Sequence, residues 1–408
     1  MFSKEIISLL HKSIQLMPFL TCARSLKHDI DELVMMALPS MKLAVVDDVE
    51  TAQAFGEQIF KALKGRFDCV HITLGKAPSA DSDTVDDIRR QTQACEALVA
   101  VGSGIVNDLC KYASFLDKKP YIIFPTAASM NGYVSANASI TVDGYKKTLP
   151  AHMPKAVFCD MSVIAAAPAR LNKSGLGDAL ARPTAQADWL LSHLWLGTPY
   201  NETPFLLLRD VEPQLFAQAR GIAMGDRDSI ELLMHNLLLS GFGMTIAGGS
   251  YPASQGEHMI AHAMEMLSVR HSREGGNPVT LHGEEIGVTT LTMARLQEKM
   301  LSRAPALASL EFPREILIGL FGEKITAEAE KAYGVKQEKI RQAILPDWDN
   351  IAQRITQVML PSSRIEAILK AAEAPCTPQA LGWTEIDYNT ALAHARFLRD
   401  RFTFLDVM

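Results

Sequence analysis

Three histidines in residues 254–283 have the residue type and spacing of metal ligands. His258 and His262 are four residues apart in GEHMIAHAMEM, a run with helical character, so both side chains would lie on one face of a helix. His282 begins a second helical run, HGEEIGVTTLTMARL. Neutral imidazole binds zinc, nickel or iron(II), so these residues predict part of a divalent-metal site. The alternative is a packed or solvated histidine pair.

A carboxylate that could complete this site is Asp178, in the sequence SGLGDAL. We expect Asp178 to lie in a glycine turn at the beginning of a helix, with Pro183 kinking that helix or delaying its start. One carboxylate and two imidazoles leave positions open on a divalent ion, as a catalytic site requires. Arg182 follows closely and is either a phosphate-binding residue or a surface arginine.

The first part of the chain alternates strand-like and helix-like segments. Strands are expected at 41–46, 67–74, 97–102 and 121–125, with helices at 50–65 and 83–96 between them. This order predicts an α/β nucleotide-binding domain with a parallel sheet, whose ligand lies at the carboxyl ends of the strands. From about residue 172 helical periodicity takes over. We therefore expect an α/β domain over 1–165 and an all-α metal and substrate domain over 166–408.

A glycine turn follows the third expected strand and could hold a pyrophosphate. Gly102 and Gly104 flank Ser103, and a helix then begins. Glycines let the backbone approach a ligand, and free N–H groups at a helix start attract phosphate. The third glycine of the Rossmann fingerprint is missing, so a chance turn is the alternative. Asp48, after the first strand, either accepts hydrogen bonds from an adenosine ribose or caps a helix; the ribose role favours NAD over NADP.

Bulk composition limits the function classes. The chain has 408 residues, a net charge of −6 and no basic footprint for nucleic acid. The N-terminus lacks the continuous apolar region of a signal peptide, and no apolar run is long enough to span a bilayer. Six scattered cysteines without a CxxC pair suit reduced thiols. These features favour a cytoplasmic enzyme or binding protein.

Three segments together resemble a known family: VGSGIVNDLCKYAS, FPTAASMNGYVSANASI and APARLNKSGLGDALARPTAQADW. This combination is similar to the sn-glycerol-1-phosphate dehydrogenases, with the bacterial type most similar. They belong to a larger group with glycerol dehydrogenase, iron-containing alcohol dehydrogenases and dehydroquinate synthase. The resemblance runs from about residue 40 to the closing ALAHARFLRDRFTFLDV. It implies a dehydroquinate synthase-like fold and NAD(P)-dependent interconversion of sn-glycerol 1-phosphate and dihydroxyacetone phosphate.

The resemblance also implies roles for individual residues. Two segments would hold the NAD(P) pyrophosphate and line the nicotinamide: Gly102, Ser103, Gly104, Ile105 and Val106 in the first, and Thr126, Ala127, Ala128, Ser129 and Ser135 in the second. Asp48 would contact the ribose. The metal ligands would be Asp178, His258 and His282, with zinc expected and nickel or iron as alternatives. Substrate would meet Asn131, Asp178 and His262, and the last two would be catalytic. A homodimer or larger homo-oligomer is expected.

Three features depart from the family pattern. Ala181, Arg182 and Pro183 follow Asp178, where the resemblance leads us to expect a polar or aromatic helical stretch. Asn131 stands where the family usually has aspartate, which bears on substrate affinity or identity. His258 and His282 are also further apart than expected, and we place the excess in a surface loop over 270–278. The alternative functions are a glycerol or polyol dehydrogenase, a dehydroquinate-synthase-like lyase, or an NAD-binding protein without turnover. The lyase is disfavoured because position 178 is aspartate rather than glutamate.

Overall fold

The structure, a computed structural model, describes residues 3–14, 18–39, 41–271, 280–303, 305–344 and 347–407, without the side chains of 269–271. Contacts divide the chain into two compact units. Unit 1 comprises Met1–Gly175 and Thr203–Gly249, and unit 2 comprises Leu176–Glu202 and Ser250–Met408. Unit 1 therefore includes helices from beyond residue 166. The division into functional domains at residue 165 stays a prediction.

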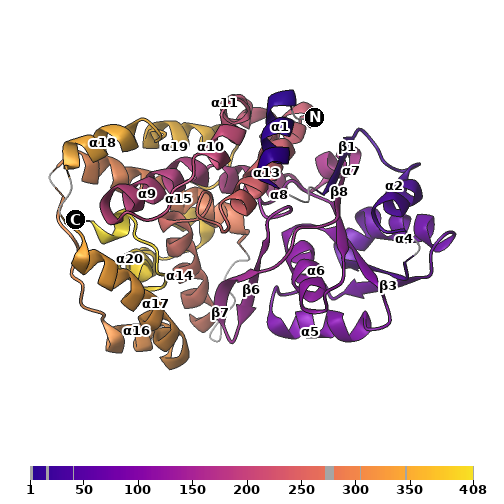
Figure 1. The fold of residues 1–408 in the computed structure, drawn as a ribbon, viewed down its shortest axis with the longest axis horizontal. Coiled ribbons are helices and arrows are strands. Elements are labelled where there is room, and N and C mark those ends of the chain that lie inside the picture. The colour runs from indigo at the N-terminus through magenta and orange to yellow at the C-terminus, as the bar shows by residue number, and fades with distance from the viewer. Residues whose placement is uncertain are drawn as a thin grey trace. The chain divides into compact units, whose positions relative to one another are not determined.

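A six-stranded parallel sheet forms the centre of unit 1 (Figure 1). Its strand order is β1-β8-β5-β4-β2-β3. The strands are β1 (Phe19–Ala23), β2 (Leu43–Asp48), β3 (Cys69–Leu74), β4 (Ala97–Gly102), β5 (Tyr121–Pro125) and β8 (Ala156–Asp160). An antiparallel hairpin follows β5, formed by β6 (Asn137–Val142) and β7 (Tyr145–Pro150). From β2 the chain continues to β3 at one edge of the sheet, whereas from β4 it continues to β5 and β8 in the opposite direction. The direction of strand addition therefore reverses between β2 and β4, and ligands bind at such a point in open α/β sheets.

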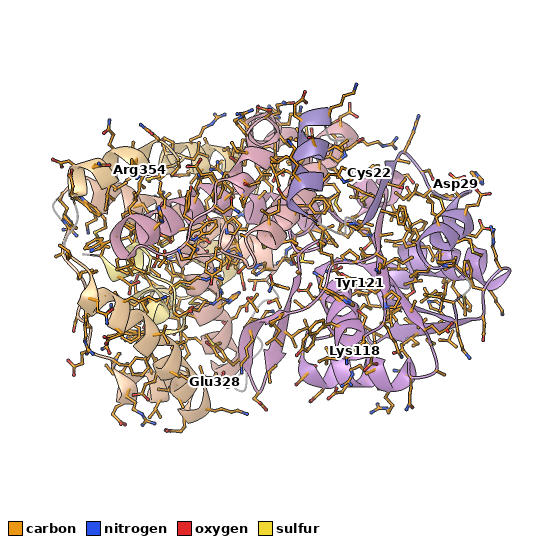
Figure 2. All side chains as sticks on the ribbon, in the orientation of Figure 1. Cys22, Asp29, Lys118, Tyr121, Glu328 and Arg354 are labelled. Atoms are coloured by element: carbon orange, nitrogen blue, oxygen red, sulfur yellow. The ribbon has the colours of Figure 1, made fainter. Side chains whose placement is uncertain are left out.

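Helices complete unit 1. The helix bounds are α1 (Lys4–Ser13), α2 (Ile30–Ala37), α3 (Val49–Thr51), the π-helix η1 (Ala52–Gly56), α4 (Glu57–Lys64), α5 (Ser82–Gln91), α6 (Gly104–Leu116), α7 (Met161–Ala166), α8 (Ala169–Ala179), α10 (Thr203–Leu208), α11 (Val211–Ala217), α12 (Ala219–Ala223) and α13 (Arg227–Ile246). The last turn of α8, from Leu176 on, belongs to unit 2. One apolar core packs β2, β4 and β5 against α2 and α4. Tyr121, at the start of β5, is fully buried, whereas Lys118 just before it is exposed (Figure 2).

The regular secondary structure in the described residues of unit 2 is helical, apart from an isolated bridge between Leu307 and Val407. Its elements after the end of α8 are α9 (Ala181–Leu196), α14 (Gly256–His271), α15 (His282–Leu301), α16 (Arg314–Phe321), α17 (Glu323–Gln342), α18 (Trp348–Thr356), α19 (Ser362–Ala371), η2 (Pro378–Leu381), α20 (Glu385–His394), η3 (Ala395–Phe397) and η4 (Phe404–Asp406). Helix α14 packs against α9, α15, α20 and η3. It thus lies at the centre of the unit, which confines its polar side chains.

The predicted fold class is confirmed: a parallel α/β sheet is followed by an all-helical region. The four expected strands match β2, β3, β4 and β5. Strands β1 and β8 carry no such prediction, although they pair with each other and β8 also pairs with β5. Among the described residues, no helix is both long and apolar enough to cross a membrane.

Candidate metal centre and cofactor-binding residues

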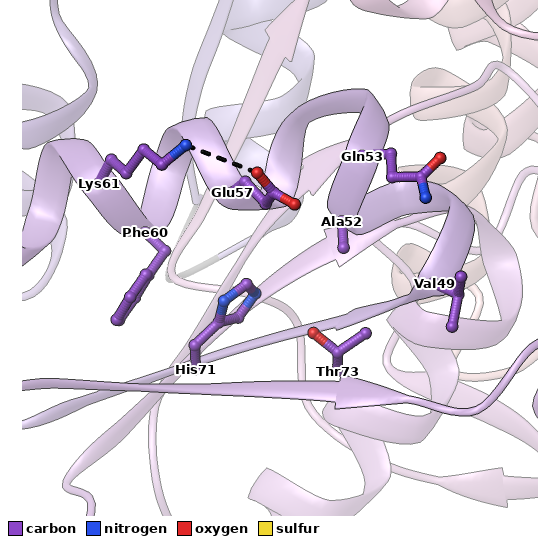
Figure 3. Close-up of a pocket in the computed structure, with 8 residues that line it drawn as sticks. All are labelled: Val49, Ala52, Gln53, Glu57, Phe60, Lys61, His71 and Thr73. Atoms are coloured by element: carbon purple, nitrogen blue, oxygen red, sulfur yellow. Dashed lines mark ion pairs between the residues drawn. The ribbon is translucent and has the colours of Figure 1, made fainter.

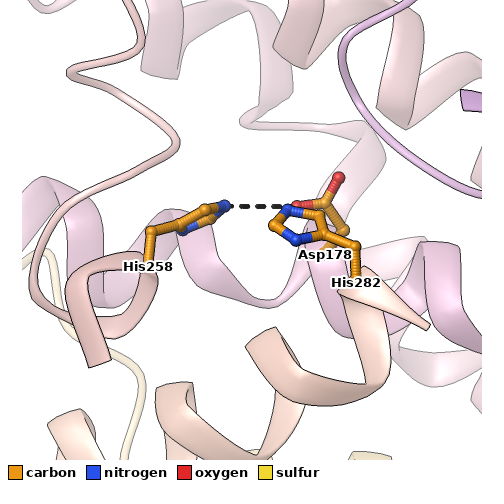
Figure 4. A group of neighbouring side chains, drawn as sticks. All are labelled: Asp178, His258 and His282. Atoms are coloured by element: carbon orange, nitrogen blue, oxygen red, sulfur yellow. Dashed lines mark ion pairs between the residues drawn. The ribbon is translucent and has the colours of Figure 1, made fainter. Parts of the chain in front are cut away.

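The structure brings the three predicted metal ligands together within unit 2 (Figure 4). One ligand atom each from Asp178, His258 and His282 lies within 4.8 Å of the other two. His258 Nε2 is 3.7 Å from Asp178 Oδ1, and both side chains are buried. Ligands about 2.1 Å from a four-coordinate zinc ion are roughly 3.4 Å apart. The three donors fit a divalent ion with small side-chain adjustments.

The prediction that Asp178 lies in a glycine turn is wrong, because Asp178 belongs to the last turn of α8. The preceding glycine serves a close helix approach instead. A Cβ atom on Gly177 would lie 2.0 Å from the Gly283 carbonyl oxygen, beside His282. Pro183 lies in the first turn of α9, which begins after a break at Leu180. A first-turn residue needs no N–H donor, so proline is tolerated at this position. The predicted delay in the helix start is therefore observed.

A buried carboxylate orients the His258 ring. His258 Nδ1 is 3.0 Å from Glu257 Oε1, which also accepts from Gln255 N at 2.6 Å, while Thr184 Oγ1 donates to Oε2 at 3.2 Å. Burial raises the pKa of Glu257, but the contact with His258 and the backbone hydrogen bonds together outweigh burial, so the pKa is lowered overall. Burial lowers the pKa of His258. Because an ionised carboxylate only accepts, the His258 proton lies on Nδ1 and the Nε2 lone pair points toward Asp178, as metal binding needs.

Asp188 in α9 connects the beginning of α14 to the C-terminal segment. Its Oδ2 accepts from Gly256 N at 3.0 Å, and its Oδ1 accepts from Phe404 N at 3.0 Å and Gln297 Nε2 at 3.1 Å. Burial and the charge of Glu257 raise the pKa of Asp188 to about 8, against the effect of these N–H donors. The Asp188 contacts thus fix the helix start from which His258 and His262 project.

His262 lies beside the two predicted ligand histidines, with its ring centroid 6.1 Å from each of those of His258 and His282. Arg399 Nη2 donates to His262 Nδ1 at 2.8 Å. A guanidinium has no acceptor, so Nδ1 holds a lone pair and the ring proton lies on Nε2. Burial, followed by the charge of Arg399, lowers the pKa of His262 well below its ordinary value. His262 is therefore a neutral donor through Nε2.

His282 also belongs to a second group of nearby ligand atoms, with Glu265 and Glu285. Its Nδ1 is 3.8 Å from Glu265 Oε1, too long for a hydrogen bond. Glu285 already accepts from Thr280 Oγ1 at 2.5 Å. The group that includes Asp178 is favoured because it combines two imidazoles with a carboxylate, as catalytic zinc sites do. The predicted surface loop over 270–278 lies outside the described residues, except for the backbone of 270 and 271 in α14.

In unit 1, the predicted pyrophosphate turn joins β4 to α6. Ser103 is the N-cap residue, and its side chain makes no capping hydrogen bond. Gly104 allows close packing, since a Cβ atom there would lie 2.9 Å from Met130 Sδ. The Ile105 side chain is exposed and that of Val106 is buried. The first-turn N–H groups of a helix lack intrahelical partners, so this turn retains the chemistry of an anion site.

The loop after β5 is held by hydrogen bonds within the loop and by hydrogen bonds to neighbouring elements. Ala127 O accepts from Tyr133 OH at 2.7 Å, and Ala128 N donates to Asn172 Oδ1 at 2.9 Å. Thr126 and Asn131 are buried, while Ser129 Oγ is 3.2 Å from Tyr133 OH. The beginning of the loop also meets the glycine turn, because Thr126 N donates to Gly102 O at 3.2 Å. These two predicted cofactor segments are therefore adjacent.

Lys111 secures the end of this loop from inside α6. Its Nζ donates to Gly132 O at 2.5 Å, to Asn137 O at 3.0 Å and to Ser135 Oγ at 3.3 Å. Ser135 Oγ donates in turn to the same two carbonyls at 3.0 Å each. Ser135 is thus committed to the loop, and its contact with nicotinamide stays a prediction.

Asp48 acts as the N-cap of α3, the alternative to the ribose role. Its Oδ1 accepts from Glu50 N at 3.0 Å and from Thr51 N at 2.8 Å. Residues Val46 and Ala100 pair in register, so the carboxyl ends of β2 and β4 are neighbours and Asp48 lies near the glycine turn. Capping uses one carboxylate oxygen, and the ribose contact stays a prediction.

A groove of about 450 Å³ lies on the α4 side of β3 in unit 1 (Figure 3). Its eight lining residues are Val49, Ala52, Gln53, Glu57, Phe60, Lys61, His71 and Thr73. His71 Nε2 is 2.6 Å from buried Asp47 Oδ2, and burial raises the pKa of Asp47. A Cβ atom on Gly56 would lie 1.9 Å from that oxygen, so glycine in η1 makes room for the pair. None of the predicted cofactor residues is among the eight.

Comparison with known proteins gives consistent matches. Residues 25–168 match the family model described as iron-containing alcohol dehydrogenase. A glycerol-1-phosphate dehydrogenase [NAD(P)+] from Bacillus velezensis is 30% identical over 334 residues, covering 82% of this chain and 75% of the relative. The Pyrococcus abyssi enzyme of the same name is 35% identical over 261 residues, covering 64% and 72%. The chain belongs to the glycerol-1-phosphate dehydrogenase family.

This family member also has the fold of solved relatives. A probable glycerol dehydrogenase from Sinorhizobium meliloti has a TM-score of 0.62 at 17% identity, covering 95% of this chain and 92% of that chain. A 1,3-propanediol oxidoreductase has a TM-score of 0.64 at 15% identity, covering 96% and 94%. The family assignment and the matched fold identify the chain as an NAD(P)-dependent oxidoreductase within the iron-containing alcohol dehydrogenase superfamily.

Several polar residues of this oxidoreductase lack a sequence prediction although they support the candidate sites. They are Glu257, Asp188, Lys111 and Arg399. Two local signals exist: Glu257 directly precedes a predicted ligand histidine, and Lys111 stands in the apolar run of α6. Asp188 and Arg399 contact partners more than 60 residues away, so their neighbours in the sequence carry no signal.

Proposed function

We propose that this family member interconverts sn-glycerol 1-phosphate and dihydroxyacetone phosphate, using NAD with NADP as the alternative cofactor. The observation that carries the proposal is the cluster of Asp178, His258 and His282 ligand atoms within 4.8 Å of one another. The names of relatives about 30% identical over most of the chain support the substrate. Asn131, in place of the aspartate usual in the family, makes a glycerol or polyol dehydrogenase the alternative to test.

Asp178, His258 and His282 would hold one divalent ion, with zinc expected and nickel or iron as alternatives. When bound, the ion would polarise the substrate oxygen at the reacting carbon, and the nicotinamide would exchange hydride with that carbon. His258 binds through Nε2 because Glu257 holds its Nδ1 proton.

His262 has a narrower role than its residue type suggests. Its Nδ1 accepts from Arg399, so the Nε2–H group can donate to a substrate hydroxyl or carbonyl oxygen. The lowered pKa of His262 favours this donor role over proton uptake during turnover. Asn131 would contact the same substrate through its amide.

Residues of unit 1 would hold the cofactor. The turn from Gly102 to Val106, at the beginning of α6, would bind the pyrophosphate through backbone N–H groups. The loop from Thr126 to Ser129 would line the nicotinamide. Asp48 would accept from the ribose, and its charge would disfavour a 2′-phosphate. A cytoplasmic location and a homodimer or larger homo-oligomer stay predictions.

The test is an absorbance assay of NADH or NADPH oxidation after the chain is loaded with zinc or nickel. Dihydroxyacetone phosphate, dihydroxyacetone and a seven-carbon phosphate substrate are compared. The proposal predicts the highest kcat/KM for dihydroxyacetone phosphate, with Asp178→Ala losing activity and bound metal together. Preference for dihydroxyacetone would establish the polyol alternative. Near-normal turnover by metal-depleted Asp178→Ala would refute the metal assignment.

A further inference from the structure

Two arginines reach the N-terminal end of α14 from the segment that follows η3. Arg399 Nη2 donates to His262 Nδ1 at 2.8 Å, and Arg399 Nη1 lies 3.5 Å from Ser254 Oγ. Arg401 donates to the Ser254 carbonyl oxygen and, at 2.8 Å, to Ser250 Oγ. Positive charge thus gathers around residues 250–262, all within unit 2.

The two guanidinium groups occupy different settings. Arg401 lies over the Tyr251 ring, 4.6 Å from its centroid, and its contacts with Ser254 and Ser250 fix it as part of the framework. Burial lowers the pKa of Arg401 to about 10, and the charge of Arg399 acts in the same direction. The charges of Asp400 and Glu257 act on Arg401 in the opposite direction and offset part of this effect. Arg399 and Arg401 still repel each other, and an anion beside Arg399 would relieve that repulsion.

Arg399 is also within reach of a substrate bound at the candidate metal site. Its hydrogen bond ends on His262, whose ring centroid is 6.1 Å from those of both ligand histidines. In dihydroxyacetone phosphate, four covalent bonds separate the ketone oxygen from phosphorus, a reach of about 5 Å at roughly 1.5 Å per bond. A substrate whose ketone oxygen lies near Asp178, His258 and His282 could therefore place its phosphate on the far side of His262.

We propose that Arg399 binds the phosphate of a phosphorylated three-carbon substrate and, through Nη2, keeps His262 as an Nε2–H donor. A guanidinium presents its N–H groups as a planar fork that matches two phosphate oxygens, which a lysine cannot reproduce. Arg401 holds the Ser254 backbone against which Arg399 lies. The inference rests on the proposed function for the identity of the substrate, and it adds the residue that distinguishes a phosphorylated substrate from a free polyol.

Arg399→Gln tests this role, with Arg295→Gln as the matched control. Arg295 lies in α15, half-exposed, in an ion pair with Glu366 at 2.8 Å. We expect Arg399→Gln to lower kcat/KM for dihydroxyacetone phosphate by about 100-fold, because the charge-assisted hydrogen bonds to the phosphate would be lost. The loss for dihydroxyacetone should stay below about 10-fold. Equal losses for both ketones would reduce Arg399 to a positioning residue for His262 and overturn the phosphate assignment.

A binding measurement separates this inference from the proposed function. Inorganic phosphate should raise the Tm of the zinc-loaded wild-type chain and of Arg295→Gln, and this rise should be absent in Arg399→Gln and reduced in Arg399→Lys. If Arg399→Gln does not fold, Arg399→Lys alone decides, because it keeps the charge but loses the fork. A wild-type chain that is stabilised by phosphate but reduces neither ketone would refute the proposed function and leave the anion site standing. Equal stabilisation of all variants would refute the site.

Discussion

Replacing Glu257 by glutamine isolates the contribution of a buried negative charge to metal binding. Glu257 is fully buried and accepts hydrogen bonds from His258, Gln255 and Thr184. Glutamine has nearly the same shape, and its amide oxygen can still accept at the Oε1 position, which lies 3.0 Å from His258 Nδ1. The Thr184 hydroxyl can rotate to accept from the new amide group. The substitution therefore removes the charge with little change in packing.

The size of the effect follows from the hydrogen bond between Glu257 and His258. An ionised acceptor makes a bond about twice as strong as a neutral one and increases the electron density at the opposite ring nitrogen. Loss of such a partner typically weakens metal binding by about 10- to 100-fold. We expect Glu257→Gln to raise the zinc Kd by that factor, because the other His258 nitrogen faces Asp178 at 3.7 Å.

The assay is competition for zinc between the chain and a chromophoric chelator at neutral pH. Glu366→Gln is the control, since Glu366 is a partly exposed carboxylate in α19 that pairs with Arg295 and Lys370. Circular dichroism and Tm establish that both variants are folded. A folded Glu257→Gln variant with the wild-type zinc Kd would show that this carboxylate does not tune His258, and the proposed ligand role of His258 would then lose its main electrostatic support.

Three further substitutions test the framework around the candidate sites. Gly177→Ala should weaken zinc binding more than 10-fold in the same competition assay, since its Cβ atom would lie 2.0 Å from a backbone oxygen. In the control Gly319→Ala in α16, the new Cβ atom would meet no described residue within 4 Å, so zinc binding should be unchanged. Lys111→Met should lower the urea midpoint by an amount equivalent to about 3 kcal/mol and weaken NADH binding measured by fluorescence, because two partly buried carbonyls lose a charged donor. The pKa of Asp188 is raised to about 8 in the folded chain. Between about pH 4 and pH 8 the folded chain therefore binds more protons than the unfolded chain, so the free energy of unfolding falls as the pH rises. Urea melts of the metal-free chain should show a shallower decline for Asp188→Asn.

The sheet of unit 1 was predictable from sequence because its central strands are apolar, short and bounded by turn residues. The residues of β4 and β5 are all buried, so their continuous apolar runs are the expected pattern for a parallel sheet. Strand β1 was not predictable in the same way. Its residues Phe19–Ala23 are exposed or only partly buried, and it pairs with β8, more than 130 residues later. An edge strand of this kind is fixed by its partner rather than by its own composition.

The residue types of the metal cluster were predictable, but the backbone that carries Asp178 was not. Glycines on both sides of Leu176 indicate a turn by local preference. In the folded chain they are helical, and the absence of a side chain at Gly177 allows α8 to approach the beginning of α15. Packing against a distant helix thus overrides the local preference, and the same approach brings Asp178 to His282.

The residues that distinguish one substrate from another pose the harder problem, because their meaning depends on distant neighbours. Arg399 stands between apolar and acidic residues in FLRDRF and has the local appearance of a surface arginine. Only the fold brings it to His262, 137 residues earlier, and there its lack of an acceptor determines which nitrogen of that histidine keeps the proton. A metal site needs a few residue types at suitable spacing, so sequence patterns reveal it. Recognition of a phosphate needs a donor such as Arg399 at a suitable distance from the metal site. This distance depends on how the C-terminal segment packs against α14.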